Sequence, residues 1–361
     1  MKIFQNIKRR GEILKAEYGS TSFVTAKFWK KIKNKNVKCE LCPRFCIIKE
    51  NETGFCKVRK NINGKLYSLV YGKPTSVAID PIEKKPLFHF FPGTYAFSIG
   101  TAGCNMSCKQ CQNWEISQSA PEKTFNYDLP PKEIIEKINL FKNKQNISSI
   151  AYTYNEPSIF IEYLLDTAKL AKKAKIKNTY HSCGFINLKP LKEICKYLDA
   201  ANIDLKYFSN KIYKEISLGA LDPVLETIKY IHSKKIWLEI TNLIIPTIND
   251  SEKMIKDMCK WIFDNIGENV PLHFSRFYPS YKLEYLPPTP IQLLERAAKI
   301  AKSTGIKFVY IGNVFGNPLE NTYCPSCNKI IIERFGYEIK QINLKNGKCK
   351  FCGEKIPGVF K

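Results

Sequence analysis

The sequence has no run of about 20 apolar residues, the length that a membrane-spanning helix requires. Residues 1–20 carry several charges and lack the continuous apolar core of a secretory signal. No internal repeat and no low-complexity linker is present. These absences argue against a membrane protein, an exported precursor and a repeat protein, and we expect a cytoplasmic globular protein.

Arginine is also scarce, although the chain is strongly basic. Only seven of the 57 Lys and Arg residues are Arg, and with 33 acidic residues the net charge is +24. Recognition of phosphates and bases favours the arginine fork, so this balance disfavours nucleic acid as a partner and is more typical of a compositional lysine bias. Residues 1–38 alone carry eleven Lys or Arg and two Glu. This basic arm is either a docking segment for an acidic partner or a solvated face.

Cysteine is abundant by contrast. In a reducing cytoplasm the fourteen cysteines predict metal ligands or redox groups in place of disulfides. Three of them stand apart, Cys183, Cys195 and Cys259. The other eleven form three groups, which are Cys39, Cys42, Cys46 and Cys56, then Cys104, Cys108 and Cys111, and last Cys324, Cys327, Cys349 and Cys352.

Strand-like and helix-like stretches alternate between the second and third cysteine groups. This alternation predicts a parallel sheet with helices outside it, closed into a partial or full (β/α) barrel of the TIM type. We expect strands near 95–100, 147–154, 176–181, 201–205, 236–245, 270–277 and 307–312, and helices near 131–143, 157–175, 188–198, 221–233, 251–266 and 290–303.

The 361 residues suffice for such a barrel, which takes about 200–250 residues, together with smaller flanking modules. We therefore predict a basic arm and cysteine-rich segment over 1–92, the barrel over 93–319 and a metal-binding module over 320–361.

Polar residues follow most of the predicted strands. In a parallel barrel these positions share one face, where chemistry is found. The residues concerned are Gly103–Cys104, Asn155–Glu156, His181–Ser182, Asp204–Lys206, Thr241–Asn242, His273–Arg276 and Asn313. Their recurrence predicts an active site at this face.

The group Cys104-x3-Cys108-x2-Cys111 lies directly after a predicted strand. Three thiolates this close on one loop can hold a [4Fe–4S] cluster and leave its fourth iron open for a ligand. A tetrahedral zinc site needs a fourth ligand, and this loop does not supply one. Zinc or free thiols are the alternatives to a cluster.

This motif resembles the defining C-x3-C-x2-C of the radical S-adenosylmethionine (SAM) superfamily. The resemblance implies that SAM binds the open iron and is reductively cleaved to a 5′-deoxyadenosyl radical that abstracts hydrogen from a substrate. Superfamily members usually carry an aromatic residue before the last cysteine, where this chain has Gln110. The resemblance makes Gln110 a candidate contact to the adenine.

Three further segments resemble the pyruvate formate-lyase activating enzymes. Tyr154-Asn155-Glu156-Pro157 stands where that branch has Gly-Gly-Glu-Pro, which implies a contact from Glu156 to the SAM amino group. Asp204-Leu205-Lys206 matches its Asp-x-Lys motif, and His273 stands where a histidine faces SAM. The structural alternatives are an acidic residue at a helix start for Glu156, a strand-end ion pair for Asp204 and Lys206, and a core histidine for His273.

A resemblance over nearly the whole chain is to the radical SAM component of the AmmeMemoRadiSam system. It implies partners from the system's other protein families and leaves the reaction and the substrate open. The resemblance to the activating enzymes implies an activating-enzyme-like reaction on a protein substrate, and radical SAM chemistry implies an external electron donor of the flavodoxin or ferredoxin type. The segments that carry the resemblance to the AmmeMemoRadiSam component are 39–46, 80–89, 111–118, 310–314, 323–327 and 352–359.

The two flanking cysteine groups differ in regularity. Cys324, Cys327, Cys349 and Cys352 form two CxxC turns, which predict one structural metal, zinc before iron, around a hairpin near 330–333 and 338–343. The less regular Cys39, Cys42, Cys46 and Cys56 are compatible with a structural zinc, with an iron site or auxiliary cluster, or with no metal.

Two other functions compete with the leading one. An iron–sulfur electron-transfer or assembly protein would need no SAM-facing residues in a barrel, so Glu156, Asp204 and Lys206 argue against it. A nucleic-acid-modifying radical SAM enzyme has only the charge in its favour and would bind RNA or DNA with a steep salt dependence.

Overall fold

The computed structural model describes residues 23–360, so the first 22 residues of the predicted basic arm lie outside the described residues. Contacts within the chain define two compact units. The described part of the first unit comprises residues 23–79, 97–107 and 113–198, and that of the second comprises 80–96, 108–112 and 199–360.

An eight-stranded sheet runs in the order β14-β13-β12-β11-β10-β9-β8-β7. Within the first unit β9 and β10 are parallel, and within the second unit β11 to β14 are parallel in succession. The predicted α/β class with a parallel sheet is therefore confirmed. The strands are β7 (Ser76–Pro81), β8 (Tyr95–Gly100), β9 (Ile147–Tyr152), β10 (Lys177–Ser182), β11 (Ala200–Asp204), β12 (Trp237–Ile244), β13 (Leu272–Arg276) and β14 (Val309–Gly312).

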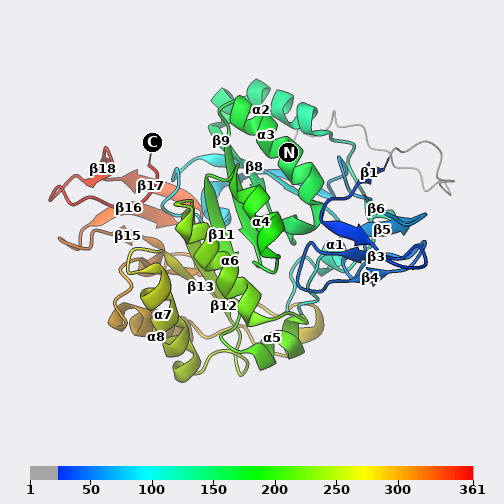
Figure 1. Cartoon of the computed structure of the whole chain (residues 1–361). Helices are drawn as coiled ribbons and strands as arrows, with labels where there is room; N and C mark the ends of the chain where they lie inside the picture. Colours follow the sequence, from blue (N-terminus) through cyan, green and yellow to red (C-terminus); the bar gives the residue numbers. More distant parts are fainter. Residues whose placement is uncertain (1–22, 361) are drawn as a thin grey trace. The chain divides into compact units, whose positions relative to one another are not determined.

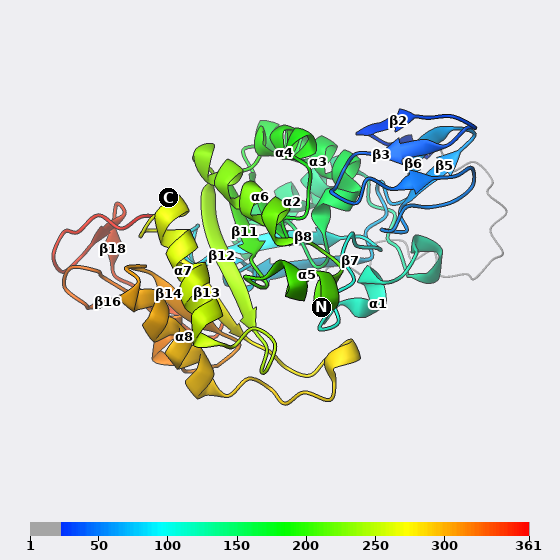
Figure 2. The same ribbon diagram turned by 60° about the horizontal axis from the view of Figure 1, so that its bottom comes forward.

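In the first unit, helices α2 and α3 contact each other and the strands β9 and β10 (Figure 1). Its helices are α1 (Trp114–Ser117), α2 (Pro131–Gln145), α3 (Ile161–Lys173) and α4 (Leu188–Cys195), with a 3₁₀ turn η4 (Pro157–Phe160) before α3. Ahead of these, six short strands form two small antiparallel sheets (Figure 2). They are β1 (Val24–Thr25), β2 (Trp29–Lys31), β3 (Val37–Cys39), β4 (Ile47–Ile48), β5 (Arg59–Ile62) and β6 (Lys65–Ser68).

In the second unit, α6 packs on β12, and α8 packs on β13, β14 and α7 (Figure 2). Its helices are α5 (Asn210–Ser217), α6 (Leu221–Ser233), α7 (Glu252–Ile266) and α8 (Ile291–Ser303). The C-terminal residues form the predicted hairpin and a second strand pair. These strands are β15 (Thr322–Tyr323), β16 (Ile330–Phe335), β17 (Glu338–Ile342), β18 (Leu344–Lys345) and β19 (Lys348–Cys349).

Local sequence signals explain where these helices begin and end. The Ser251 side chain accepts the Met254 amide at 3.3 Å, which caps α7 as expected from the sequence. Asn146 ends α2 in the left-handed conformation, with φ of 50°. No helix within residues 23–360 is both long and apolar enough to cross a bilayer.

Candidate functional site

In the first unit, the start of the second cysteine group is fixed by close backbone packing. Gly103 has φ of +83°, and a Cβ there would lie 2.2 Å from the Cys56 carbonyl oxygen, so no side chain fits. The Met106 amide donates to Cys104 Sγ at 3.4 Å. The buried Asn105 side chain donates to the Phe185 carbonyl at 2.7 Å. The residues around Cys104 are therefore held on both sides.

In the second unit, residues 108–112 are held by backbone bonds from distant segments. The Lys109 amide donates to the Ile216 carbonyl at 2.9 Å, and Ser280 Oγ donates to the Cys111 carbonyl at 3.2 Å. Gln110 is 4% exposed, and its Nε2 donates to the Tyr207 hydroxyl. Its Oε1 is buried and has no hydrogen-bond partner within the described protein. A buried acceptor without a partner costs about 1–3 kcal/mol, which a ligand donor would recover.

The predicted pair Asp204 and Lys206 lies at the end of β11. Lys206 Nζ donates to Asp204 Oδ2 at 2.6 Å, and the side chains keep 17% and 24% of their surfaces exposed, for Lys206 and Asp204 respectively. Burial raises the pKa of the Cys108 thiol, and the nearby Lys206 ammonium opposes this rise. The structure therefore brings the ion pair and one cysteine of the motif together.

Glu156 is fully buried at the start of η4, and protein donors surround its carboxylate. Oε1 accepts from the Ser158 amide at 3.0 Å, Tyr180 Oη at 3.2 Å and Ser182 Oγ at 2.9 Å. Oε2 accepts from Ser182 Oγ and the Cys183 amide, both at 2.9 Å, and from the Cys183 thiol at 2.8 Å. A carboxylate offers about four lone-pair sites, so these donors occupy it. The geometry gives Glu156 a positioning role at the ends of β9 and β10, and its contact to SAM stays a prediction.

His273 is 2% exposed and lies on β13 within a buried network. Its Nε2 is 2.7 Å from Glu239 Oε2, and its ring stacks on Tyr310 at 5.0 Å. Glu239 also accepts the backbone amides of Phe88 and His89 at 3.0 and 2.8 Å. Burial alone would raise the pKa of the Glu239 carboxyl, but the hydrogen bond with His273 and the nearby histidines hold it below its usual value. These contacts describe a core histidine, and the predicted SAM contact is untested.

The residues present fit the groups that the motif implies. Three thiol donors occur within residues 104–111, and one of them, Cys108, lies near the Lys206 cation. The unpartnered Gln110 Oε1 stands next to Cys111 in the chain and is an acceptor of the kind that an adenine amino group can use. The ion pair at the end of β11 can meet the charged amino and carboxylate groups of SAM.

Cys324, Cys327, Cys349 and Cys352, the C-terminal quartet, converge as predicted. Their sulfurs all lie within 4.8 Å of one another, with Cys324 and Cys352 at 3.5 Å and Cys327 and Cys349 at 3.8 Å. A tetrahedral zinc site with Zn–S bonds of 2.3 Å places its sulfurs about 3.8 Å apart. The sulfur spacing therefore suits a single metal ion.

The module around this quartet shares its core with the rest of the second unit. Cys324, Cys349, Ile331 and Ile356 are buried in one apolar cluster. That cluster also contains Phe88, Phe308 and Tyr310. Residues 320–360 therefore do not bury a core of their own.

Cys39, Cys42, Cys46 and Cys56, the N-terminal quartet, line one small cavity in the first unit. Burial raises the pKa of the Cys42 and Cys56 thiols to about 12. Metal binding would have to deprotonate these thiols. The cavity is also lined by Arg44, Arg59 and Asn105.

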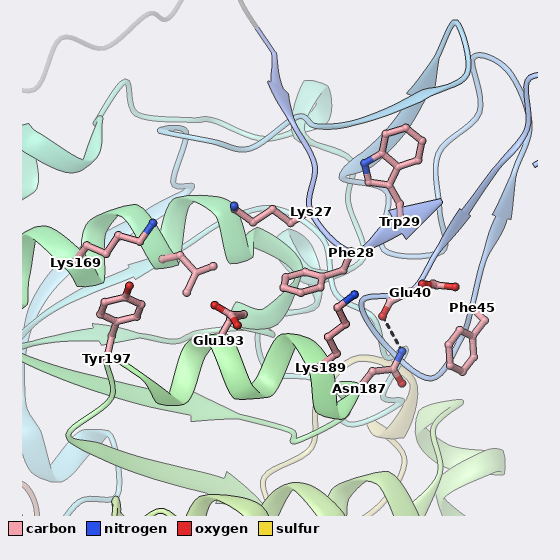
Figure 3. A pocket seen from close by; sticks show the side chains of 11 residues that line it. Lys27, Phe28, Trp29, Glu40, Phe45, Lys169, Asn187, Lys189, Glu193 and Tyr197 are labelled. Carbon is pink, nitrogen blue, oxygen red and sulfur yellow. Dashed lines mark hydrogen bonds between the residues drawn. The ribbon is translucent and has the colours of Figure 1, made fainter. Parts of the chain in front are cut away.

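A separate cavity of about 810 Å³ lies between the N-terminal strands and the helices α3 and α4 (Figure 3). Charged and aromatic side chains line it, and Asn187 Nδ2 donates to the Glu40 carbonyl at 2.8 Å at its edge. None of the residues predicted to bind a cofactor lines this cavity, so it is not the predicted SAM site. Its lining is Lys27, Phe28, Trp29, Glu40, Phe45, Leu165, Lys169, Asn187, Lys189, Glu193 and Tyr197.

Several residues that shape the site were not identified from the sequence. Cys183 stands alone in the sequence, yet its thiol and amide both bind Glu156. Tyr207 and Asn105 hold Gln110 and the residues around Cys104. Tyr207 directly follows Lys206 and Asn105 directly follows Cys104, but these positions in the sequence gave no sign of the contacts.

The chain matches a known protein family and several known proteins. Residues 98–262 match the family model described as the Radical SAM superfamily. An uncharacterized protein of Methanocaldococcus jannaschii is 46% identical over 333 residues, which are 92% of this chain and 98% of that protein. A pyruvate formate-lyase-activating enzyme of Clostridium pasteurianum is 27% identical over 165 residues, which are 44% of this chain and 66% of that protein.

Among solved structures, Streptococcus suis SuiB bound to S-adenosylmethionine is 13% identical, with a TM-score of 0.49 over 68% of this chain and 56% of that one. The superfamily is defined by a [4Fe–4S] cluster and SAM, and all three cysteines of the motif lie within the matched residues. The chain is an enzyme that belongs to the radical SAM superfamily.

Proposed function

We propose that the chain reductively cleaves SAM at a [4Fe–4S] cluster bound by Cys104, Cys108 and Cys111, and that it acts on a protein substrate. When bound, the cluster and SAM together supply a 5′-deoxyadenosyl radical that abstracts a hydrogen atom. The observation that carries the proposal is the buried, unpartnered Oε1 of Gln110 beside Cys111, because it leaves one acceptor ready for a ligand.

The chain's own residues orient SAM in this account. Gln110 Oε1 accepts a hydrogen bond from the adenine amino group, while Nε2 stays bound to Tyr207. Asp204 and Lys206 bind the amino and carboxylate groups of SAM through charge-assisted hydrogen bonds. Glu156 fixes the ends of β9 and β10, so that the neighbouring backbone needs no rearrangement when SAM binds.

Two arguments support a protein substrate. The Clostridium pasteurianum relative is named for activating pyruvate formate-lyase, which is itself a protein. The chain also carries cysteine modules on both sides of the matched residues, which give it more surface than a small substrate requires. We also propose that the chain is the radical SAM component of the AmmeMemoRadiSam system and that it receives electrons from a donor of the flavodoxin or ferredoxin type. The proposed metal of the C-terminal quartet is zinc.

The substrate class is tested by deuterium transfer. Cell proteins and small metabolites, each carrying non-exchangeable deuterium, are offered separately to the reduced enzyme with SAM. Label in 5′-deoxyadenosine with the protein fraction alone is the expected result. Label with the metabolite fraction alone contradicts a protein substrate. An enzyme with Cys108→Ala is the control, because it should give no labelled product with either fraction.

A further inference from the structure

We propose that Cys39, Cys42, Cys46 and Cys56 hold a second iron–sulfur cluster, ligated entirely by protein, next to the residues around Cys104. The superfamily motif accounts for only one cluster, and this quartet lies outside the matched residues 98–262. The proposal rests on how the four cysteines converge, on the spacing of their sulfurs and on what they pack against.

The local fold brings the four cysteines to one place. Cys39 ends β3, and its amide donates to the Cys46 carbonyl at 2.9 Å, which pairs the two sides of this loop. A turn closed by the bond from the Phe45 amide to the Cys42 carbonyl, at 3.2 Å, lies between them. Cys56 reaches the same cavity from the turn before β5, and Cys39, Cys42 and Cys56 are each less than 9% exposed.

The spacing of the sulfurs in the N-terminal quartet favours a cluster over a single zinc ion. Within residues 23–360, the C-terminal quartet is the one group of three or more cysteine, histidine or carboxylate ligands whose atoms all lie within 4.8 Å of one another. No three sulfurs of the N-terminal quartet meet this limit, although all four line one cavity. A single zinc ion needs its sulfurs about 3.8 Å apart, whereas a cubane binds each cysteine at a different corner and so spreads the sulfurs more widely.

The cavity suits an anionic group that lies close to Cys104. Arg44 lines it and can balance part of the negative charge of a cluster with four thiolates. Arg59 also lines it, and its guanidinium is paired with the Glu162 carboxylate at 3.0 Å. Arg44 Nε donates to the Asn105 carbonyl at 2.5 Å, and Gly103 packs on the Cys56 carbonyl so closely that a Cβ would clash. The quartet therefore lies against the residues on both sides of Cys104.

Full protein ligation limits what this second cluster can do. With no open iron it binds neither SAM nor substrate, so its chemistry is one-electron transfer. It takes one electron from a reduced donor of the ferredoxin or flavodoxin type and returns to its oxidised state by passing that electron toward the cluster on the Cys104 loop.

The test is the iron content of the full chain after anaerobic reconstitution. The wild-type chain should hold about eight iron and eight sulfide ions, and the triple variant Cys104→Ala, Cys108→Ala, Cys111→Ala should retain about four of each. The electron paramagnetic resonance (EPR) signal of the reduced triple variant should not change when SAM is added. Cys259→Ala, which removes a buried cysteine of α7 outside all three groups, is the control and should keep about eight.

Either of two results overturns the proposal. One is a triple variant with less than about one iron per chain, or with a second zinc in place of iron. The other is an EPR signal that SAM shifts in the triple variant, because it would reveal an open iron. If the triple variant does not fold, Cys42→Ala with Cys56→Ala decides the matter: a fall from about eight iron to about four supports the second cluster, and an unchanged iron content overturns it.

Discussion

Glu156 Oε2 accepts a hydrogen bond from the Cys183 thiol at 2.8 Å, which joins the turn after β9 to the end of β10. Cys183 is otherwise an isolated cysteine in the sequence, and Glu156 belongs to the segment that resembles a SAM-binding motif. The contact explains why a carboxylate is buried here: it gathers donors from two neighbouring strand ends and leaves no oxygen unpaired.

Glu156→Gln should therefore lower the free energy of unfolding by about 2–4 kcal/mol, because an amide cannot accept from all of these donors and turns an NH₂ group toward some of them. Urea unfolding measures the change. Glu193→Gln, which removes a surface carboxylate paired with Lys196, is the matched control and should cost less than about 1 kcal/mol. Wild-type stability combined with weaker SAM binding would show that Glu156 contacts SAM and does not act by positioning.

Gln110→Met should weaken SAM binding about tenfold, because the buried Oε1 that awaits the adenine donor is lost. Titration calorimetry with the reconstituted enzyme measures the Kd. Tyr207→Phe is the control, since it removes the partner of Nε2 and leaves Oε1 in place, and its Kd should change by less than about threefold. Equal affinity of the Gln110 variant and the wild type would remove Gln110 from the SAM site.

Removing the metal from the C-terminal quartet should loosen the strands β15–β19 and the shared apolar cluster around Phe88 and Tyr310. Because this module has no core of its own, metal binding supplies part of its folding energy. Hydrogen exchange of the full chain with Cys349→Ser should show faster exchange in these strands and one metal ion fewer per chain. Cys195→Ser on α4 is the control and should leave the exchange of these strands and the metal content unchanged. Unchanged exchange in the Cys349 variant would show that the metal is dispensable for this fold.

His89 should make the chain less stable in mild acid. Burial lowers the pKa of its imidazole from 6.5 to about 4. Its Nδ1 donates to the Pro357 carbonyl at 2.6 Å, so Nε2 accepts from the Tyr310 hydroxyl at 2.5 Å, and protonation of Nε2 would break that bond. The folded chain then binds fewer protons than the unfolded chain between these pKa values, so stability falls as pH falls from about 6.5 toward 4.

The pKa shift of His89 corresponds to a loss of about 3 kcal/mol in the free energy of unfolding as the pH falls from about 6.5 to about 4. His89→Gln should remove it, so the difference in unfolding free energy between wild type and variant should shrink by about this amount from pH 7 to pH 4.5. His232→Gln, on the last turn of α6, is the control. A difference that does not depend on pH would mean that His89 is not held neutral.

The sequence predicted the regular elements well where a periodic pattern spans several turns. Helix α6 and the start of α7 at its Ser251 cap lie where the apolar spacing and the cap residue place them. The strands β1 to β6 have only two to four residues, too few to show a period, and none of them was predicted. The eight-residue helix α5, capped by Ser209, was also missed.

The site was predictable where ligands form short motifs of known spacing and not where single residues meet. The spacing of the C-terminal quartet was enough to predict its convergence. The partners of Glu156 stand up to 27 residues away on another strand, and those of His273 come from β12, so only the fold reveals them. A CxxC turn brings two metal ligands together within four residues, so its spacing can be recognised in the sequence. Contacts between residues of different strands depend on the order of the strands in the sheet, which the sequence pattern does not give.

The most direct test of the account is SAM cleavage by the reconstituted, chemically reduced enzyme under anaerobic conditions. We predict that the wild-type chain forms 5′-deoxyadenosine and that Cys104→Ala, Cys108→Ala and Cys111→Ala each abolish it, because each variant loses a thiolate of the cluster. Cys259→Ala should cleave SAM as the wild type does. Undiminished 5′-deoxyadenosine formation in any one of the three motif variants, or none in the fully reconstituted wild type, would contradict the account.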